Sequence, residues 1–462
     1  MRPALLLAIA LVATACTGGS ASEPPGTLIG SESFDAGYPL APDVPTGDLD
    51  PRAEAELAGL LVGVTAGTFE NEAVDQVVAA GDARVAWALA DLMRFIQVGE
   101  PAAVLERGFS QLTGASLAGA PGPAFTEAFD HLIAWDLPAW PLYENFKRDL
   151  YTVIEPGWGR FFEEDVSIDW RLVTWGGVLI DDRPLGSPDP CPRGCIPALD
   201  DPLTTPANEG DWYSDDAIVF GLEVNCETLA LPRNQMQIHE MMNLTLGGVR
   251  LGIPYCTLCG SAQAYITEGV PDGFEPAVLR TSGLLSRSNK VMYDLLTGSV
   301  FDTFTGRALS GPLGEVDLVL DQVSVVSSTW GQWKQDHPDT RIIARDGGIG
   351  RSYSDDPLRG RDDDGPIFPT GPVDPRLPVM ELVVGAVDAE GNPIAFPVES
   401  TRAALEAGTV ININGLSVSL SGDGLIVTGP GGGTSGEVGS HESFWFAWSQ
   451  FNPETLIWSP IP

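Results

Sequence analysis

The sequence predicts an α+β protein: an N-terminal all-α, repeat-like helical module is followed by a β-rich module made of two pseudo-symmetric halves. Three observations lead to this class. Apolar residues recur at helical spacing up to about residue 155, and short Val/Ile/Leu-rich runs alternate with Gly, Pro and Asp after Pro156. Segments of the second region then recur in order later in the chain. At 462 residues, more than one domain is expected.

The helical module is predicted over residues 49–160. Two sets of apolar residues each share one helix face: Leu57, Leu60, Leu61 and Val64, and Val85, Leu89, Leu92 and Ile96. Between them, Gly81 and Asp82 form the pattern of a helix stop followed by an N-cap. Helices of this length joined by tight turns resemble a short stack of helical-repeat pairs.

The duplication rests on three ordered correspondences. Residues 330–340 align with 445–455, so that both copies keep a Trp-x-x-Trp pair followed by Gln, Pro and Thr. Residues 219–232 align with 384–397, and 243–248 align with 412–415. We therefore expect two related halves, 165–345 and 376–462. The tryptophan pairs are expected to pack in the core or between the halves.

The two halves are joined by a predicted acidic linker loop, residues 346–375, which includes Asp362 to Asp364. These carboxylates lack the spacing of a calcium loop, which favours a solvated loop. The whole chain is also acidic, with 63 Asp and Glu against 25 Lys and Arg and a net charge of −38. Such a charge excludes nucleic acid as a natural partner.

The N-terminus is predicted to be a signal peptide, residues 1–15. Arg2 precedes the apolar run Ala4–Ala13, which is too short to span a membrane, and small residues then precede Cys16. This pattern resembles a bacterial lipobox, so Cys16 is expected to be lipidated. The protein is then exported and lipid-anchored on the periplasmic or cell-surface side of the membrane. Residues 17–48, rich in Gly, Ser, Pro and Asp, complete a predicted flexible tether over 16–48.

Five cysteines remain after Cys16. In an exported chain disulfides persist, and Cys191 and Cys195 lie in a Pro/Gly-rich loop that favours a local disulfide. Cys226 lies in a strand-like run and is expected to be a buried small residue. The Cys-x-x-Cys pair of Cys256 and Cys259 is the most informative motif in the chain, because two thiols at this spacing can form a disulfide, exchange one, or bind a metal together.

Three interpretations of this pair stay open. In the first, the site binds a soft metal ion, copper or zinc, and its potential ligands are Cys256, Cys259, His239, His337 and Met292. A redox dithiol assisted by His239 is the second. The third is a structural disulfide in a protein without enzymatic activity. A zinc-protease motif is excluded because Asn243 stands where the second histidine is required, and covalent c-type haem is excluded because Gly260 follows the pair.

Residues 196–343 resemble the Domain of Unknown Function 3179 family. The resemblance rests on the segments 196–202, 239–243, 255–260, 282–284, 291–294 and 333–338, of which the Tyr-Cys-x-x-Cys-Gly block at 255–260 is the specific one. The second half, to residue 458, is similar to the same family. Thr257 stands where the family usually has proline. The resemblance implies a shared extracytoplasmic module with a Cys/His-centred site, and no established activity.

Overall fold

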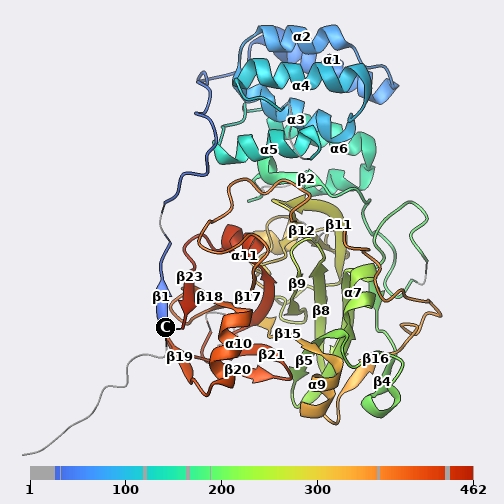
Figure 1. Cartoon of the computed structure of the whole chain (residues 1–462). Coiled ribbons are helices and arrows are strands. Elements are labelled where there is room, and N and C mark those ends of the chain that lie inside the picture. The colour runs from blue at the N-terminus through green and yellow to red at the C-terminus, as the bar shows by residue number, and fades with distance from the viewer. Residues whose placement is uncertain are drawn as a thin grey trace, which may run out of the picture.

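The computed structural model describes residues 26–31, 33–117, 122–162, 167–187, 189–361, 365–431 and 437–460. A helical module lies against one end of a larger β-rich module (Figure 1). The predicted α+β class is confirmed. The signal peptide, the lipidation site Cys16 and the acidic run 362–364 lie outside the described residues. Within the described part of the chain, no helix combines the length and the apolar character needed to cross a membrane.

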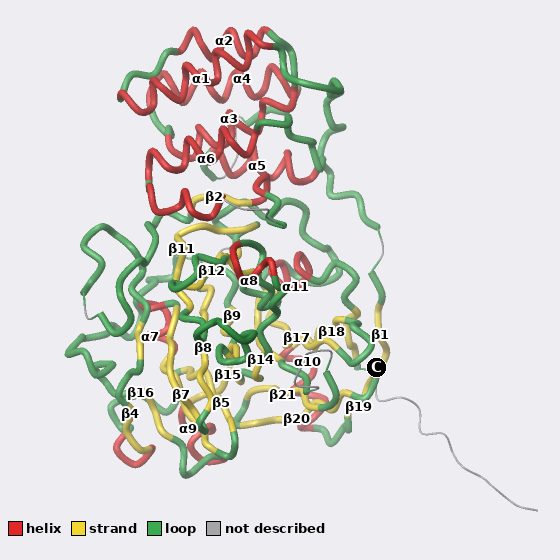
Figure 2. Tube along the Cα trace, turned by 180° about the vertical axis from the view of Figure 1, so that it is seen from behind, coloured by secondary structure: helices red, strands yellow, loops and turns green. Residues whose placement is uncertain are grey.

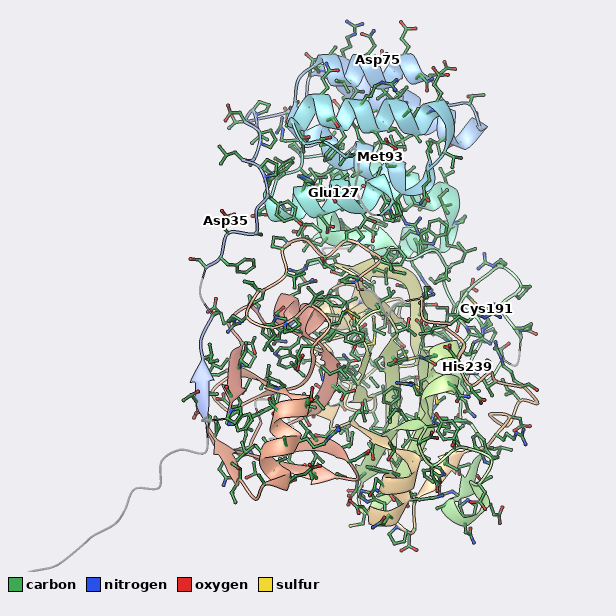
Figure 3. The ribbon with its side chains drawn as sticks, viewed as in Figure 1. Asp35, Asp75, Met93, Glu127, Cys191 and His239 are labelled. Atoms are coloured by element: carbon green, nitrogen blue, oxygen red, sulfur yellow. A yellow bond between two sulfur atoms is a disulfide. The ribbon has the colours of Figure 1, made fainter. Side chains whose placement is uncertain are left out.

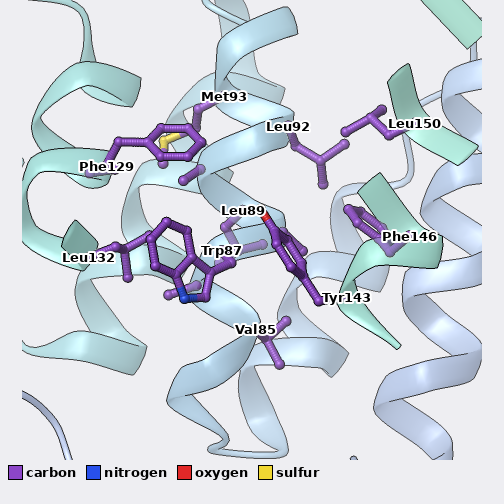
Figure 4. Packing of buried hydrophobic residues seen from close by; sticks show 14 of the residues in the cluster. Val85, Trp87, Leu89, Leu92, Met93, Phe129, Leu132, Tyr143, Phe146 and Leu150 are labelled. Carbon is purple, nitrogen blue, oxygen red and sulfur yellow. The ribbon is translucent and has the colours of Figure 1, made fainter. Parts of the chain in front are cut away.

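The helical module contains six α-helices within its described residues: α1 (Pro51–Ala66), α2 (Asn71–Ala79), α3 (Ala86–Phe95), α4 (Gly99–Thr113), α5 (Ala124–Ala134) and α6 (Tyr143–Ile154). Helix α3 is buried on nearly all sides, and residues such as Trp87 and Leu89 form the centre of the core (Figure 4). The turn before α3 has the predicted form. Gly81 has a left-handed φ of 71°, and the Asp82 carboxylate accepts the Arg84 N–H at 3.0 Å.

The two halves of the β-rich module contain the same five-stranded sheet. In the first half the strand order is β15 (Val326–Thr329), β5 (Ile218–Val224), β6 (Glu227–Pro232), β16 (Arg341–Ile343) and β4 (Thr204–Pro206). In the second it is β22 (Ser440–Phe444), β17 (Leu382–Val387), β18 (Pro393–Pro397), β23 (Leu456–Ser459) and β1 (Thr27–Ile29). Each sheet has one parallel pair, β6–β16 or β18–β23, at the same place.

The tryptophan pairs explain why the repeat is visible in the sequence. They lie on the short helices α9 (Trp330–Asp336) and α11 (Trp445–Phe451), at equivalent places in the two halves. Trp333 packs on Gly221, and Trp448 packs on Gly385; a Cβ at either glycine would lie within 2.5 Å of the indole ring. The ring N–H of each tryptophan donates to a threonine hydroxyl seven residues later, at 3.1 and 2.8 Å. The two segments share a local fold, as the duplication requires.

In each half, a helix and a hairpin follow the first strand pair, which is β5–β6 in the first half and β17–β18 in the second. In the first half these are α7 (Arg233–His239), β7 (Met241–Leu246) and β8 (Val249–Cys256); in the second they are α10 (Val398–Glu406), β19 (Ile411–Ile413) and β20 (Leu416–Ser421). Strand β21 (Gly424–Thr428) completes the second set. Within the described residues, the first half has strands with no counterpart in the second, including β10 (Ala264–Ile266), β11 (Leu279–Ser286) and β12 (Asn289–Asp294). Figure 2 labels β11 and β12.

The prediction of a flexible tether over 16–48 is wrong for the residues from Gly26 onward that the structure describes. Strand β1 pairs antiparallel with β23 and forms the edge of the second-half sheet. Further along, the Pro39 carbonyl accepts the indole N–H of Trp135 at 2.7 Å, and the Gly47 carbonyl accepts from Arg84 at 2.7 Å. The segment therefore runs along both modules. Its polar composition concealed this, because backbone groups make most of its contacts.

Candidate dithiol site

The Cys-x-x-Cys motif forms a tight turn at the end of β8. Strand β8 ends at Cys256, and the short strand β9 (Ser261–Ala262) pairs back on it, with Cys256 opposite Ser261. The Cys259 N–H donates to the Cys256 carbonyl at 3.2 Å. Gly260 follows with φ of 62°, and a Cβ there would lie 2.8 Å from the Phe444 ring. Glycine is needed at this position for both reasons.

The two thiols are buried and adjacent. Their Sγ atoms lie 3.0 Å apart, and both cysteines are free. The turn between β11 and β12 supplies acceptors: the Ser288 carbonyl lies 3.4 Å from the Cys259 Sγ, and the Asn289 Oδ1 lies 3.6 Å from it. Arg287 and Ser288 both have left-handed φ values, 45° and 68°, which place this carbonyl over the thiols. Sheet register therefore brings the dithiol and a distant hairpin together.

A buried ion pair lies beside Cys256. The Lys290 Nζ lies 2.8 Å from the Glu240 Oε2 and also donates to the Glu240 backbone carbonyl at 2.7 Å. The Thr257 hydroxyl donates to Glu240 Oε1 at 3.1 Å, and the Arg361 guanidinium donates to Thr257 at 3.3 Å. Glu240 has a left-handed φ of 51° at the end of α7, which turns its side chain away from the helix. The hydroxyl of Thr257 thus has a role that the proline usual in the family could not fulfil.

The surroundings separate the pKa values of the two thiols. Burial and the nearby Glu240 charge raise the pKa of Cys256, but the hydrogen bond from Cys259, the Lys290 backbone N–H and the Lys290 charge outweigh them, so that its pKa is lowered. Burial raises the pKa of Cys259, and the interactions with Cys256 raise it further. The arrangement stabilises one thiolate, on Cys256, with the proton held on Cys259.

Cys256 faces a small cavity of about 70 Å³. Glu240, Lys290, Thr257 and Arg361 supply its polar wall. Its apolar wall is formed by Val178, Ile196, Leu258, Leu284, Leu285 and Phe368. Cys259 does not line this cavity. The cysteine with the lowered pKa is therefore the one that lines the cavity.

His239 does not join the thiols, so the predicted metal-binding role of its ring is wrong. Its Nδ1 lies 2.7 Å from the Pro197 carbonyl, and its Nε2 lies 2.8 Å from the Tyr353 hydroxyl. Burial lowers its pKa to about 4, so the ring is neutral. It lines a different cavity of about 330 Å³, beside the loop that carries Cys191 (Figure 3). The adjacent Glu240 lines the other cavity, beside Cys256. Of the pair His239 and Glu240, it is therefore Glu240 that lies next to the dithiol.

His337 and Met292 are likewise not ligands of the pair. The His337 Nε2 lies 3.1 Å from the Ser421 hydroxyl, and its ring packs on Trp333 at 4.0 Å between centroids. Met292 lies in a separate apolar cluster from the two cysteines. The sequence could not show that His337 and Met292 lie away from the two thiols, because their positions depend on how distant strands and helices pack.

A second sulfur cluster is present near Asp181. Cys191 and Cys195 form a disulfide, as the loop composition indicated. Their Sγ atoms lie 3.9 and 3.7 Å from the Asp181 Oδ1. Among the described residues, these three form the group of His, Cys, Asp or Glu side chains whose ligand atoms are close enough together to hold a metal ion. A disulfide binds no metal as a thiolate would, so such a site requires its reduction.

Two further points differ from the sequence analysis. Cys226, expected to be buried, is exposed with φ of 64° in the turn between β5 and β6. Lys290 was not identified from the sequence, because its partner Glu240 is 50 residues away and no short motif joins them. The available signal was a lysine directly before the apolar run 291–293 in a strand, since lysine is rarely buried unless it is paired.

Residues 193–415 match the family model described as a protein of unknown function, DUF3179. Searches of curated proteins and of solved structures found no match. The resemblance seen at the Tyr-Cys-x-x-Cys-Gly block is confirmed. The matched region includes the dithiol, Glu240, Lys290 and Cys195, but it begins after Cys191.

Proposed function

We propose that Cys256 and Cys259 form a redox-active dithiol that exchanges electrons with a disulfide substrate. The observation that carries the proposal is the asymmetry of the pair. Cys256 has the lowered pKa and faces a cavity beside Lys290, whereas Cys259 has the raised pKa and lies behind it. In thiol–disulfide exchange the attacking sulfur must be an accessible thiolate and the second thiol must wait for the mixed disulfide.

The chemistry proceeds in two balanced steps. The Cys256 thiolate attacks one sulfur of the substrate disulfide; that S–S bond breaks, and a substrate thiolate leaves as the mixed disulfide forms. Cys259 then loses its proton to the leaving thiolate and attacks the Cys256 Sγ. The second substrate sulfur is released as a thiolate, which takes from solvent the proton that Cys256 had lost to it, and the pair becomes a disulfide. One substrate disulfide is reduced to two thiols, and one protein dithiol is oxidised; the reverse sequence oxidises a substrate dithiol.

The site limits the substrate. A cavity of about 70 Å³ holds little more than two water molecules. Phe368 and Arg361, from the segment between the halves, form part of its wall. A small or extended disulfide therefore fits better than a flat protein surface. Lys290 and Arg361 make the wall partly cationic in a chain with a net charge of −38.

Trapping of the mixed disulfide tests this proposal. Cys259→Ser should hold a small disulfide such as cystamine on Cys256, detectable by intact mass, because the resolving thiol is absent. Cys256→Ser is the matched control and should trap none, since the remaining thiol has the raised pKa and no cavity. Equal trapping by both variants, or by neither, contradicts the assignment of Cys256 as the attacking thiol.

Soft-metal binding is a second candidate, supported by the approach of Asp181 to Cys191 and Cys195. Reduction of that disulfide would present two thiolates and one carboxylate, a ligand set suited to zinc and, through the sulfurs, to copper. Wild-type protein should then bind about one zinc ion only after reduction, and Asp181→Asn should weaken binding. Retention of zinc by Cys191→Ser would contradict this site and leave Cys256 and Cys259 as the ligands.

We also propose that the protein is exported and lipid-anchored through Cys16, with no nucleic acid as partner. The lipobox-like sequence before Cys16 and the acidic composition support this. An oxidising compartment is also where a thiol–disulfide exchange site has substrates. Mass spectrometry of the membrane fraction should give a mature chain that begins with a lipidated Cys16; an unmodified Cys16 would contradict it.

A further inference from the structure

A third and larger cavity, of about 850 Å³, lies between the two halves. The equivalent edge strands β15 and β22 meet beside it, where the Val325 N–H donates to the Ser440 carbonyl at 2.8 Å. Both halves line it with equivalent positions. Thr329 pairs with Ile218, and Phe444 pairs with Leu382; all four line the cavity. The cavity is thus centred on the pseudo-symmetry axis, and its size is typical of a small-molecule site.

The two copies differ in chemistry at this cavity. Ser327 and Glu442 are equivalent, since their partners Phe220 and Val384 precede the glycines under the two tryptophans. At the first residue of the following helix, α7 has Arg233 where α10 has Val398. At equivalent positions of the two halves, the cavity is therefore lined by Ser327 and Arg233 on one side and by Glu442 and Val398 on the other. Packing between the halves alone does not require this difference.

Apolar side chains form part of the wall, and three of them are aromatic. The apolar lining consists of Ile218, Phe220, Tyr255, Met380, Leu382, Val398 and Phe444. The rings of Phe220 and Tyr255 lie 4.9 Å apart. This wall suits an aliphatic or aromatic body rather than a sugar or a metal ion.

One polar donor that faces the cavity has no hydrogen-bond acceptor. The Arg402 Nε, on α10, is buried and has no hydrogen-bond partner among the described residues. Arg233 lines the cavity from α7 at its exposed rim. Both charges act on the Glu442 carboxyl, yet neither guanidinium forms an ion pair with it in the described structure. A buried donor without an acceptor destabilises the protein, and a ligand oxygen would supply the acceptor.

Glu442 can serve as a donor to the same ligand oxygens. Burial, only partly offset by the hydrogen bond from Ser327 and by Arg402 and Arg233, raises its pKa to about 7. A neutral carboxylic acid at this pH donates a hydrogen bond to an anion, where a carboxylate would repel it.

Other titratable groups line the same cavity. They are Glu381 before β17, Glu399 on α10, Asp423 in the β20–β21 turn and Tyr255 on β8. Asp423 accepts from Ser328 and Thr329, at 2.7 and 2.8 Å, and its pKa is lowered. Glu399 is exposed at the rim, where solvent screens its charge. These acids restrict an anion to the region between Arg402 and Glu442.

We propose that this cavity binds a small organic carboxylate with an apolar body, whose carboxylate lies between Arg402 and Glu442 and whose body packs on Phe220, Tyr255 and Phe444. The site is independent of the dithiol, because the two cavities lie on different sides of the 255–260 turn: Tyr255 and Gly260 line this one, and Cys256 lines the other.

Titration calorimetry on the whole protein tests the proposal. The ligands are 4-phenylbutyrate and octanoate, and the binding of each is compared with that of its neutral amide. Both carboxylates should bind at least tenfold more tightly than their amides. Arg402→Gln should remove that preference, whereas Arg148→Gln, an exposed arginine on α6, should keep it. A second readout is proton uptake on binding at pH 7.5, which Glu442→Gln should abolish, because the neutral acid is then replaced by an amide that cannot titrate.

The opposite results overturn it. They are saturable binding with no preference for the carboxylate, unchanged affinity in Arg402→Gln, or no binding by either acid. Unfolding curves of each variant show whether a loss of binding follows from misfolding; if Arg402→Gln does not fold, Arg402→Lys is compared, which keeps the charge and should retain part of the preference.

Discussion

Replacement of Lys290 by methionine should destabilise the protein and raise the pKa of Cys256 together. Lys290 and the Glu240 side chain are 3% and 12% exposed, and their charged atoms lie 2.8 Å apart. Removal of one partner of a buried ion pair costs about 3–5 kcal/mol, because the other charge stays buried without compensation. Thr257 still donates to Glu240, so we expect the lower end, about 3 kcal/mol.

The same substitution removes a positive charge beside Cys256. Because that charge helps to lower the pKa of the thiol, its loss should raise the pKa and reduce the fraction of thiolate at neutral pH. The rate of alkylation by iodoacetamide at pH 7 should therefore fall in Lys290→Met, and the pH midpoint of the rate should move upward.

Two variants test these effects. Glu240→Gln combined with Lys290→Met should recover most of the stability in urea unfolding, and it should also restore the alkylation rate, because the Glu240 charge raises the pKa of Cys256 as the Lys290 charge lowers it. Lys334→Met removes an ion pair with Asp215 whose side chains are 24% and 71% exposed, so it should cost no more than about 1 kcal/mol. The reasoning is refuted if Lys290→Met unfolds at the same urea concentration as wild type and alkylates at the same rate.

Three further results are expected. Trp448→Ala should cost about 3–5 kcal/mol in urea unfolding, and Gly385→Ala should also destabilise, because its Cβ would lie 2.1 Å from the indole; wild-type stability in either would refute the packing argument. Burial lowers the pKa of His239 from 6.5 to about 4, so the unfolded chain binds more protons between these values and stability falls as pH falls through that window. Comparison of unfolding at pH 7 and 4 should show wild type losing about 3 kcal/mol more than His239→Gln, and identical pH profiles would contradict this. Cys256 should react at least tenfold faster with methyl methanethiosulfonate than with the bulkier Ellman reagent, because its cavity is about 70 Å³; equal rates would mean that the thiol is open to solvent.

The duplication could be predicted from the sequence because its physical cause lies in single residues. A tryptophan that packs on a glycine in the neighbouring strand constrains both positions, and each half keeps both residues, Gly221 with Trp333 and Gly385 with Trp448. The edge strand β1 could not be predicted in the same way. It is supplied by residues 27–29, far from the rest of its sheet, and main-chain pairing places few demands on side chains.

The sequence predicted the two cysteines of the site but not the residues that surround them. Cys256 and Cys259 are adjacent because their turn is local, and local geometry follows from sequence spacing. His239 was placed with them only because it is close along the chain; the end of α7 turns the ring toward Tyr353 and leaves Glu240 facing the thiols. Lys290 depends on the packing of β12 against β8, which no motif encodes.

The reduction potential of the Cys256–Cys259 pair tests the central claim most directly. It can be measured by equilibrating the protein with defined ratios of reduced and oxidised glutathione or dithiothreitol and counting alkylated thiols by mass, with Cys191→Ser/Cys195→Ser to remove the second pair. A redox dithiol should titrate between about −120 and −270 mV, the range of known exchange proteins. A pair that stays oxidised below about −300 mV would be a structural disulfide, and that result would contradict the proposed function.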